Sequence, residues 1–206
     1  MRSRASIALA MFFTLVPVTL LVPGLHELVV TAHGGSASDA HAFMTVNMLA
    51  GMFTVPFGMR LARRQREVGR WIALALAVDA LAFVGMGLAP SLPVLYAFRV
   101  LDGAVHLPAV TLLMLASNRA SGAQRGGSLG ALATALMIGV AIGSPFGGWL
   151  VDRAPGLVYT VGAVLLVVAA GISLAIPAVP LPKGQGRAHR YAFDRERLRA
   201  WIPLGY

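Results

Sequence analysis

The sequence predicts an all-α, polytopic membrane protein with six transmembrane helices. Its 206 residues are 57% hydrophobic and 12% charged, and that charged fraction is about half of what an ordinary soluble domain carries. Several apolar stretches come close to the roughly 20 residues that a helix needs to cross a bilayer. The mean hydropathy of +0.75 agrees with this class.

Six apolar stretches are the expected spans. They cover residues 5–30, 41–59, 71–88, 93–116, 127–153 and 157–178. The first follows Arg2 and Arg4, as a signal peptide would, but it is longer than a signal core of about 7–15 residues, so we expect it to be retained. Residues 1–182 then form one six-helix domain. Residues 183–206 form a basic cytoplasmic tail whose pattern fits an amphipathic interfacial helix.

Local residues explain where the spans begin and end. The first contains Pro17 and Pro23, which membrane helices tolerate when neighbouring groups satisfy the freed backbone. The second and fourth are followed by segments that contain arginine, and the third and fifth by tight proline-containing turns at 89–91 and 152–156. The sixth is almost wholly apolar.

The positive charges predict the orientation. With both termini cytoplasmic, every lysine and arginine except Arg99 and Arg153 lies on the inner side, as the positive-inside rule expects. We therefore expect an integral protein of a bacterial inner (plasma) membrane. The net charge of +9 is explained by this bias, so the expected partner is the lipid bilayer and no nucleic acid.

Small residues recur at every fourth position of the fifth span. They are Gly127, Ala131, Ala135, Gly139, Gly143 and Gly147. Positions four apart share a helix face, so they form a ridge with almost no side chains, against which another helix can pack closely in lipid. We expect this ridge to be part of a sliding contact with a second six-helix unit.

The ends of the second and fifth spans resemble each other. Gly58 and Arg63 are matched by Gly148 and Arg153 at equal spacing. Because the two spans cross the membrane in opposite directions, the match predicts an inverted three-plus-three repeat, as in many secondary transporters.

Three motifs resemble those of the amino-terminal half of the major facilitator superfamily. In the loop after the second span, Gly58, Arg63 and Arg66 fit the signature G-x-L-x-D-R-x-G-R-R, with Ala62 in place of the aspartate. In the family, that aspartate helps to latch two six-helix halves together. Arg99 and Gly103 fit the R-x-x-x-G element of the fourth span.

The third motif is the most specific. The fifth span resembles the antiporter pattern G-x-x-x-G-P-x-x-G-G through four glycines, with the proline one place late. These residues are Gly139, Gly143, Pro145, Gly147 and Gly148. In the family, this pattern is associated with exporters, notably drug–proton antiporters.

The resemblance implies half of a major facilitator fold and secondary active transport, with proton-coupled export of a small organic compound as the expected activity. Full members place the substrate between two halves, so we expect a homodimer or a separately encoded second half. The alternatives are a non-transporting membrane subunit or assembly factor, and a truncated transporter.

Ionisable residues within the spans are the candidate functional residues, because burying them in a membrane is costly. Arg99, Asp102 and His106 share one helix face, and Asp79 lies midway along the third span. They form either a proton-coupling unit or, for Arg99 and Asp102, a static ion pair; His106 is favoured as a hydrogen-bonded packing residue. Asn47 is expected to bond a neighbouring helix.

No enzyme, cofactor or metal site is expected. The glycines of the fifth span lie in an apolar helix, which is the wrong setting for a phosphate-binding loop. The sequence has no cysteine, and the spacing of His26, His33 and His41 does not supply the three or four converging ligands that zinc requires.

Overall fold

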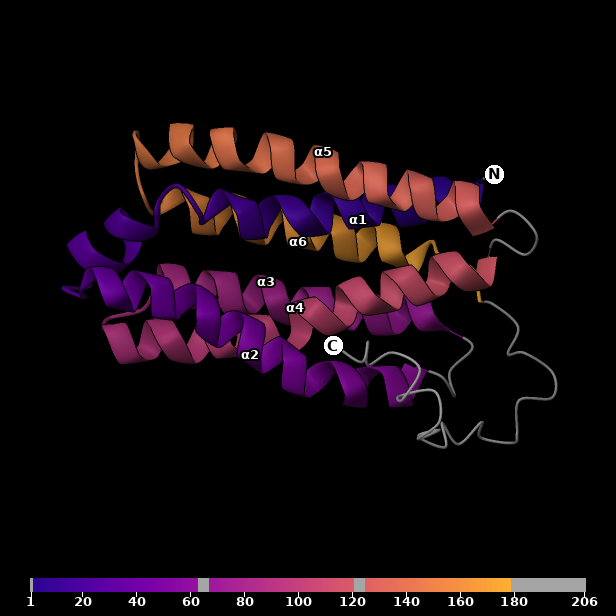
Figure 1. The fold of residues 1–206 in the computed structure, drawn as a ribbon, viewed down its shortest axis with the longest axis horizontal. Coiled ribbons are helices and arrows are strands. Elements are labelled where there is room, and N and C mark those ends of the chain that lie inside the picture. Colours follow the sequence, from indigo (N-terminus) through magenta and orange to yellow (C-terminus); the bar gives the residue numbers. More distant parts are fainter. Residues whose placement is uncertain (1, 63–66, 121–124, 179–206) are drawn as a thin grey trace, which may run out of the picture.

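The computed structural model describes residues 2–62, 67–120 and 125–178. These residues form six α-helices and one short π-helix, and they contain no strand. The elements are α1 (Arg2–Leu20), η1 (His26–Thr31), α2 (Ala37–Ala62), α3 (Val68–Gly87), α4 (Leu92–Ala120), α5 (Arg125–Val151) and α6 (Leu157–Leu174). The helices run along the long axis of the molecule (Figure 1). The tail and the arginines of the loop between α2 and α3 lie outside the described residues.

Five helices, α2 to α6, are long and apolar enough to cross a membrane. The first span differs from the expectation of one continuous helix over 5–30, because α1 ends at Leu20 and a turn separates it from η1. Pro17 lies inside α1 and Pro23 lies in the turn. Neither proline has a backbone N–H to continue the helical hydrogen bonds, which explains the break.

The helices pack in an ordered pattern. α4 packs on α2 and α3, α1 packs on α5 and α6, and α3 packs on α6. Exchanging α1, α2 and α3 for α4, α5 and α6 leaves this pattern unchanged, as a three-plus-three repeat predicts. The inverted relation between the two triplets stays a prediction.

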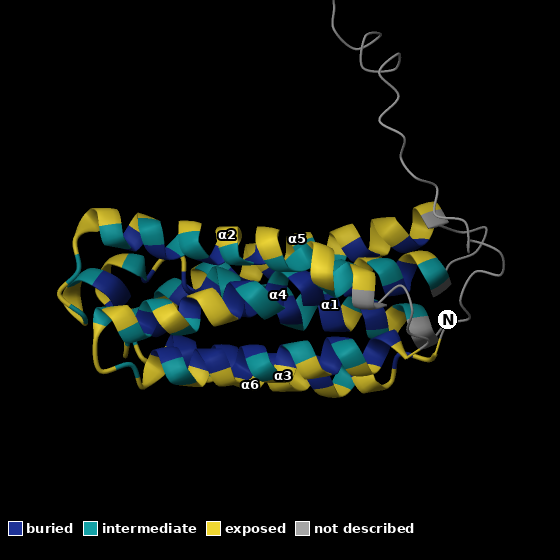
Figure 2. Cartoon of the chain, turned by 90° about the horizontal axis from the view of Figure 1, so that it is seen from below, coloured by how far each residue is buried: buried dark blue, intermediate teal, exposed yellow. Residues whose placement is uncertain are grey.

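The two edge helices α2 and α5 are the least buried spans. Figure 2 shows both along one edge of the molecule, with α3 and α6 at the opposite edge and α1 and α4 between them. In the spanning windows, 17% of residues are buried in both α2 and α5, against 56% in α3 and 50% in α4. Both helices carry exposed large apolar side chains, among them Phe57 and Met137.

The small-residue ridge of α5 packs against α1 of the same chain. A Cβ on Gly139 would lie 3.2 Å from the carbonyl oxygen of Phe12, and one on Gly143 would lie 2.9 Å from that of Val16. A Cβ on Gly147 would overlap the backbone of Leu20. The close helix contact is therefore confirmed for these three glycines, and the expectation that they face a second unit is wrong, since α1 already covers them. Gly127 and Ala131 of the same ridge are exposed, so for them the expectation stays a prediction.

This packing predicts opposite effects for two alanine substitutions in α5. Gly147→Ala should destabilise the protein by about 1–3 kcal/mol, since the added methyl group forces α1 and α5 apart. Gly130→Ala should be neutral or stabilising by up to about 1 kcal/mol, because alanine is the better helix former and nothing lies within 4 Å of the added Cβ. Thermal unfolding in detergent measures both, and equal stabilities would contradict the packing argument.

Candidate functional site

Five polar residues are buried together where α2, α3 and α4 meet. We call them the polar cluster: Asn47, Asp79, Arg99, Asp102 and His106. The side chains of Asp79, Arg99 and Asp102 have no exposed surface. The spacing of three and four residues along α4 directs its three members to one helix face, and Asp79 meets that face from α3. The structure thus brings together the four ionisable residues that the sequence singled out.

One half of the polar cluster joins α4 to α2 through an ion pair. Arg99 donates from Nη1 to Asp102 Oδ2, and the same oxygen accepts a hydrogen bond of 2.9 Å from Asn47 Nδ2. The interhelical bond expected of Asn47 is therefore confirmed. Arg99 also donates from Nε to the carbonyl oxygen of Phe43 at 3.3 Å, and its guanidinium carbon lies 4.7 Å from the centre of the Phe43 ring.

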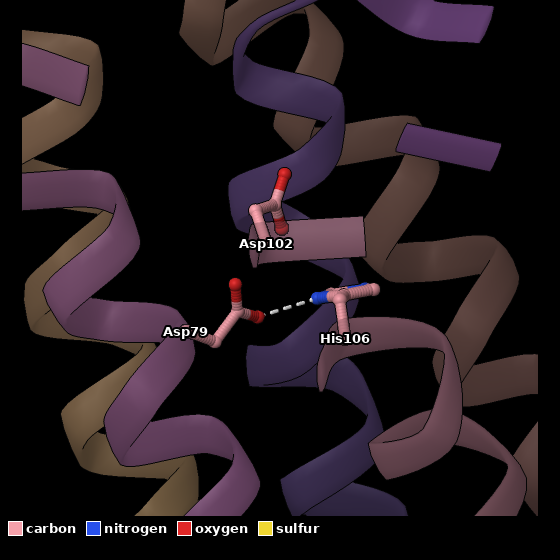
Figure 3. Close-up of side chains that lie close together, drawn as sticks. All are labelled: Asp79, Asp102 and His106. Carbon is pink, nitrogen blue, oxygen red and sulfur yellow. Dashed lines mark hydrogen bonds and ion pairs between the residues drawn. The ribbon is translucent and has the colours of Figure 1, made fainter. Parts of the chain in front are cut away.

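The other half of the polar cluster joins α4 to α3. His106 Nδ1 and Asp79 Oδ2 lie 2.7 Å apart and share one hydrogen bond. Figure 3 shows this bond, with the side chains of Asp79 and His106 pointing toward one another and Asp102 next to them. His106 is thus hydrogen-bonded, as a packing histidine would be, and its partner is a buried carboxylate.

The two halves meet at two carboxylate oxygens that lack partners. Among the described residues, Asp79 Oδ1 and Asp102 Oδ1 are buried without a hydrogen bond. Buried polar atoms normally have a partner. In addition, the polar cluster holds two carboxyl groups and one guanidinium, so with His106 neutral it carries one excess negative charge. With both carboxyl groups ionised, one added positive charge would balance the charge of the polar cluster.

The donor atoms of Asp79, Asp102 and His106 could also hold a metal ion, since one atom from each lies within 4.8 Å of the others. Carboxylate oxygen and imidazole nitrogen are ordinary ligands of divalent metals. However, the guanidinium of Arg99 is bonded to Asp102 and would repel such an ion at short range. A divalent ion would also exceed the single charge that neutrality requires, so a proton fits the charge balance better.

Close helix contact makes these bonds reachable. A Cβ on Gly103 would overlap the backbone of Asn47, so glycine lets α2 approach α4 at this level. Arg99 and Gly103 are four residues apart and face the same helix. This gives a physical reason for the arginine–glycine spacing in α4. The arginine binds α2, and the glycine leaves the space that α2 needs to approach.

The remaining predicted residues lie elsewhere. Gly58 packs on α4, where a Cβ would lie 3.1 Å from Pro108, and Gly148 faces Pro23. Pro145 lies inside α5. Arg63 and Arg66 fall outside the described residues. The sequence reasoning missed Phe43 as a partner of Arg99; its position four residues before Asn47 on the same face of α2 was the available signal.

An apolar cavity of about 250 Å³ lies between α2, α3 and α4. Thr54 and Gly58 line it on α2, and Ala104 and Pro108 line it on α4. The cavity therefore begins within two residues of Asp102 along α4.

Comparisons with known proteins agree with this architecture. A family model described as "Major Facilitator Superfamily" matches residues 7–204. The solved structure of the human organic anion transporter MFSD10 (TETRAN) is similar with a TM-score of 0.62 and 15% sequence identity, over 87% of this chain and 48% of that one. The chain thus spans about half the length of that transporter, and the likeness at this identity is one of fold. No curated protein sequence matches the chain.

The family model covers almost the whole chain, and the fold match is to a transporter and not to an enzyme. Several apolar helices of spanning length make the chain an integral membrane protein. The protein belongs to the Major Facilitator Superfamily.

Proposed function

We propose that this chain is a secondary active transporter unit that exports a small organic compound in exchange for protons, with the polar cluster as the coupling site. The observation that carries the proposal is the excess of one buried carboxylate over guanidinium groups, together with two carboxylate oxygens that lack partners. A buried charge without compensation is costly, so the site favours a state with one added proton.

The arrangement supplies two states that differ by one proton. Arg99 compensates Asp102, which leaves Asp79 to the imidazole of His106. One proton on Asp79, on Asp102 or on His106 makes the whole polar cluster neutral, and loss of that proton leaves one negative charge in a low-dielectric interior. Coupling requires such a difference, because only a ligand that distinguishes two states can shift their populations.

The proposed topology places the polar cluster inside the membrane. Both termini are cytoplasmic in this proposal, on the evidence of the loop charges, and the two helix triplets are inverted repeats in a bacterial inner membrane. Asp79 and Asp102 then lie in the central parts of α3 and α4, where coupling sites of repeat-built transporters lie. The direction of transport rests on the resemblance of α5 to the antiporter motif.

A second six-helix unit completes the transporter in this proposal. The edge formed by α2 and α5 is the least buried part of the bundle, and the chain spans about half the length of the similar transporter MFSD10. We assign this edge to a partner, either a second copy or a separately encoded half, with the substrate between the two units.

Removing either carboxylate should abolish coupling. Asp79→Asn and Asp102→Asn should each lower proton-driven flux at least about tenfold, equivalent to about 1.4 kcal/mol, because the amide can neither carry nor release the coupling proton. Proteoliposomes with an imposed pH gradient, tested with fluorescein as organic anion and ethidium as organic cation, measure the flux. Glu67→Gln is the matched control, since Glu67 is an exposed carboxylate paired with Arg70.

If both variants keep wild-type flux and pH dependence, the coupling assignment is wrong. If the wild-type chain shows no flux but co-purifies in fixed ratio with a larger complex, the chain is a non-transporting subunit.

Two substitutions of His106 should distinguish a role in proton exchange from a role in packing. His106→Asn keeps an N–H that can bond Asp79 but cannot take up a proton, so we expect near-normal stability and a flattened pH profile of flux. His106→Leu leaves both Asp79 oxygens without a donor and should cost about 1–3 kcal/mol of stability. Flux against pH and thermal unfolding distinguish the two variants; an unchanged pH profile in His106→Asn would exclude histidine from the proton path.

The proposed partner edge can be tested by crosslinking, because the chain has no native cysteine. Phe57→Cys on α2 should crosslink to a partner in native membranes, and Val164→Cys on α6, at the opposite edge, should not. The two side chains are 71% and 57% exposed, so exposure alone does not explain a difference. Mass spectrometry of the product distinguishes a second copy from another chain, and equal crosslinking at both sites would count against the assignment.

A further inference from the structure

α2 is attached to the bundle mainly through α4. It makes its largest contact there, and most of its spanning window is unburied. At one end, the hydroxyl of Tyr96 donates to the carbonyl oxygen of Asp39 at 2.6 Å. Within its first half, α2 meets the ion pair between Arg99 and Asp102.

The first half of α2 contributes three contacts to this ion pair. Asn47 Nδ2 donates to Asp102 Oδ2, the carbonyl oxygen of Phe43 accepts from Arg99 Nε, and Met44 Sδ lies 3.3 Å from Arg99 Nη2. The ion pair is therefore also the polar attachment point of a helix. At this level the backbone of Asn47 lies where a side chain on residue 103 would be, and Gly103 leaves that space free. Gly103 therefore has no side chain that could interlock with α2.

The strength of this attachment depends on the charge of Asp102. A hydrogen bond from an amide to an ionised carboxylate is roughly twice as strong as one to a neutral acid. Asp102 Oδ2 accepts from both Asn47 and Arg99, while Oδ1 has no partner. When Asp102 is neutralised, the Asn47 bond weakens, and Arg99 loses the partner that holds it in place beside Phe43.

We infer that Asn47 is a positioning residue that links the placement of α2 to the charge state of Asp102, holding α2 on α4 when Asp102 is ionised and releasing it when Asp102 is neutral. The inference rests on the proposed function, since it needs the polar cluster to exchange a proton. Arg99 and His106 on α4 and Asp79 on α3 are the charged and titratable groups facing Asp102. From α2 the facing side chain is the amide of Asn47.

The inferred movement of α2 also affects the proposed partner edge. α2 forms one side of that edge, so a change at Asp102 moves a helix that the second unit contacts. No chain of intermediate residues is needed, because Asn47 belongs to the moving helix and touches Asp102 directly.

The test measures the position of α2 against α3 as pH changes. Cysteines at Phe53 on α2 and Leu81 on α3, both 67% exposed, carry spin labels in the full chain in nanodiscs, and pulsed electron paramagnetic resonance records the distance from mildly acidic to mildly alkaline pH. In the wild-type background, the ratio of held to released populations should change at least about fivefold, the lower end of ordinary coupling between sites.

Asn47→Leu should give the released population at every pH. Thr54→Val is the matched control on α2, because the Thr54 hydroxyl bonds only backbone carbonyls of its own helix, and it should keep the wild-type response. A purely structural Asn47 would change the distance at all pH values and leave its pH dependence intact. Asn47→Ala, which also lacks the donor, replaces Asn47→Leu if the larger side chain prevents folding.

Asp102→Asn in the same labelled background distinguishes an error in the proposed proton site from an error in the role assigned to Asn47. If Asp102→Asn abolishes the pH response but the Asn47 variants keep it, the proton site stands and the role of Asn47 is overturned. If the wild-type background shows no pH response, the inference fails, and the coupling assignment is decided separately by the flux of the Asp79→Asn and Asp102→Asn variants.

Discussion

Two carboxylates and one guanidinium are buried in the same small volume, and much of this structure follows from that charge imbalance. An ion taken out of water is stabilised only where partners and hydrogen bonds surround it. Arg99 and Asn47 provide them for one oxygen of Asp102, and His106 provides one for Asp79. Two carboxylate oxygen atoms remain without a hydrogen bond, and the proposed function places the response to a proton at these groups.

The helix packing around the polar cluster follows from the same need for short distances. An Asn side chain can reach Asp102 only if α2 and α4 approach closely, and Gly103 permits that approach. In lipid, no hydrophobic force drives helices together, so close van der Waals contact and interhelical hydrogen bonds supply the association. Small residues and the polar cluster therefore act together at the α2–α4 contact.

The sequence was sufficient for the helices and for the membership of the site, because both depend on local pattern. Apolar length predicted the five candidate spans α2 to α6, and the spacing of Arg99, Asp102 and His106 predicted a shared face. The sequence was insufficient for contacts between helices. The ridge of α5 predicted a close contact with another helix, but its own residues do not identify that helix as α1. Asp79 was found as an isolated acid, and its pairing with His106 depends on how α3 lies against α4, a relation across 27 residues. The break after Leu20 lies next to Pro23, whereas α1 continues past Pro17, and the general tolerance of membrane helices for proline did not distinguish the two.

The two edge helices differ in how they are held, and this difference bears on mechanism. α5 packs on α1 through glycines that meet backbone carbonyls, a contact whose strength does not depend on any charge. α2 packs on α4 through glycine contacts as well, but within its first half it also bonds the ion pair. In the proposed mechanism, a proton changes the attachment of α2 and leaves that of α5 unaltered. If a second unit binds both edges, α5 would provide the constant part of the contact and α2 the part that changes with protonation.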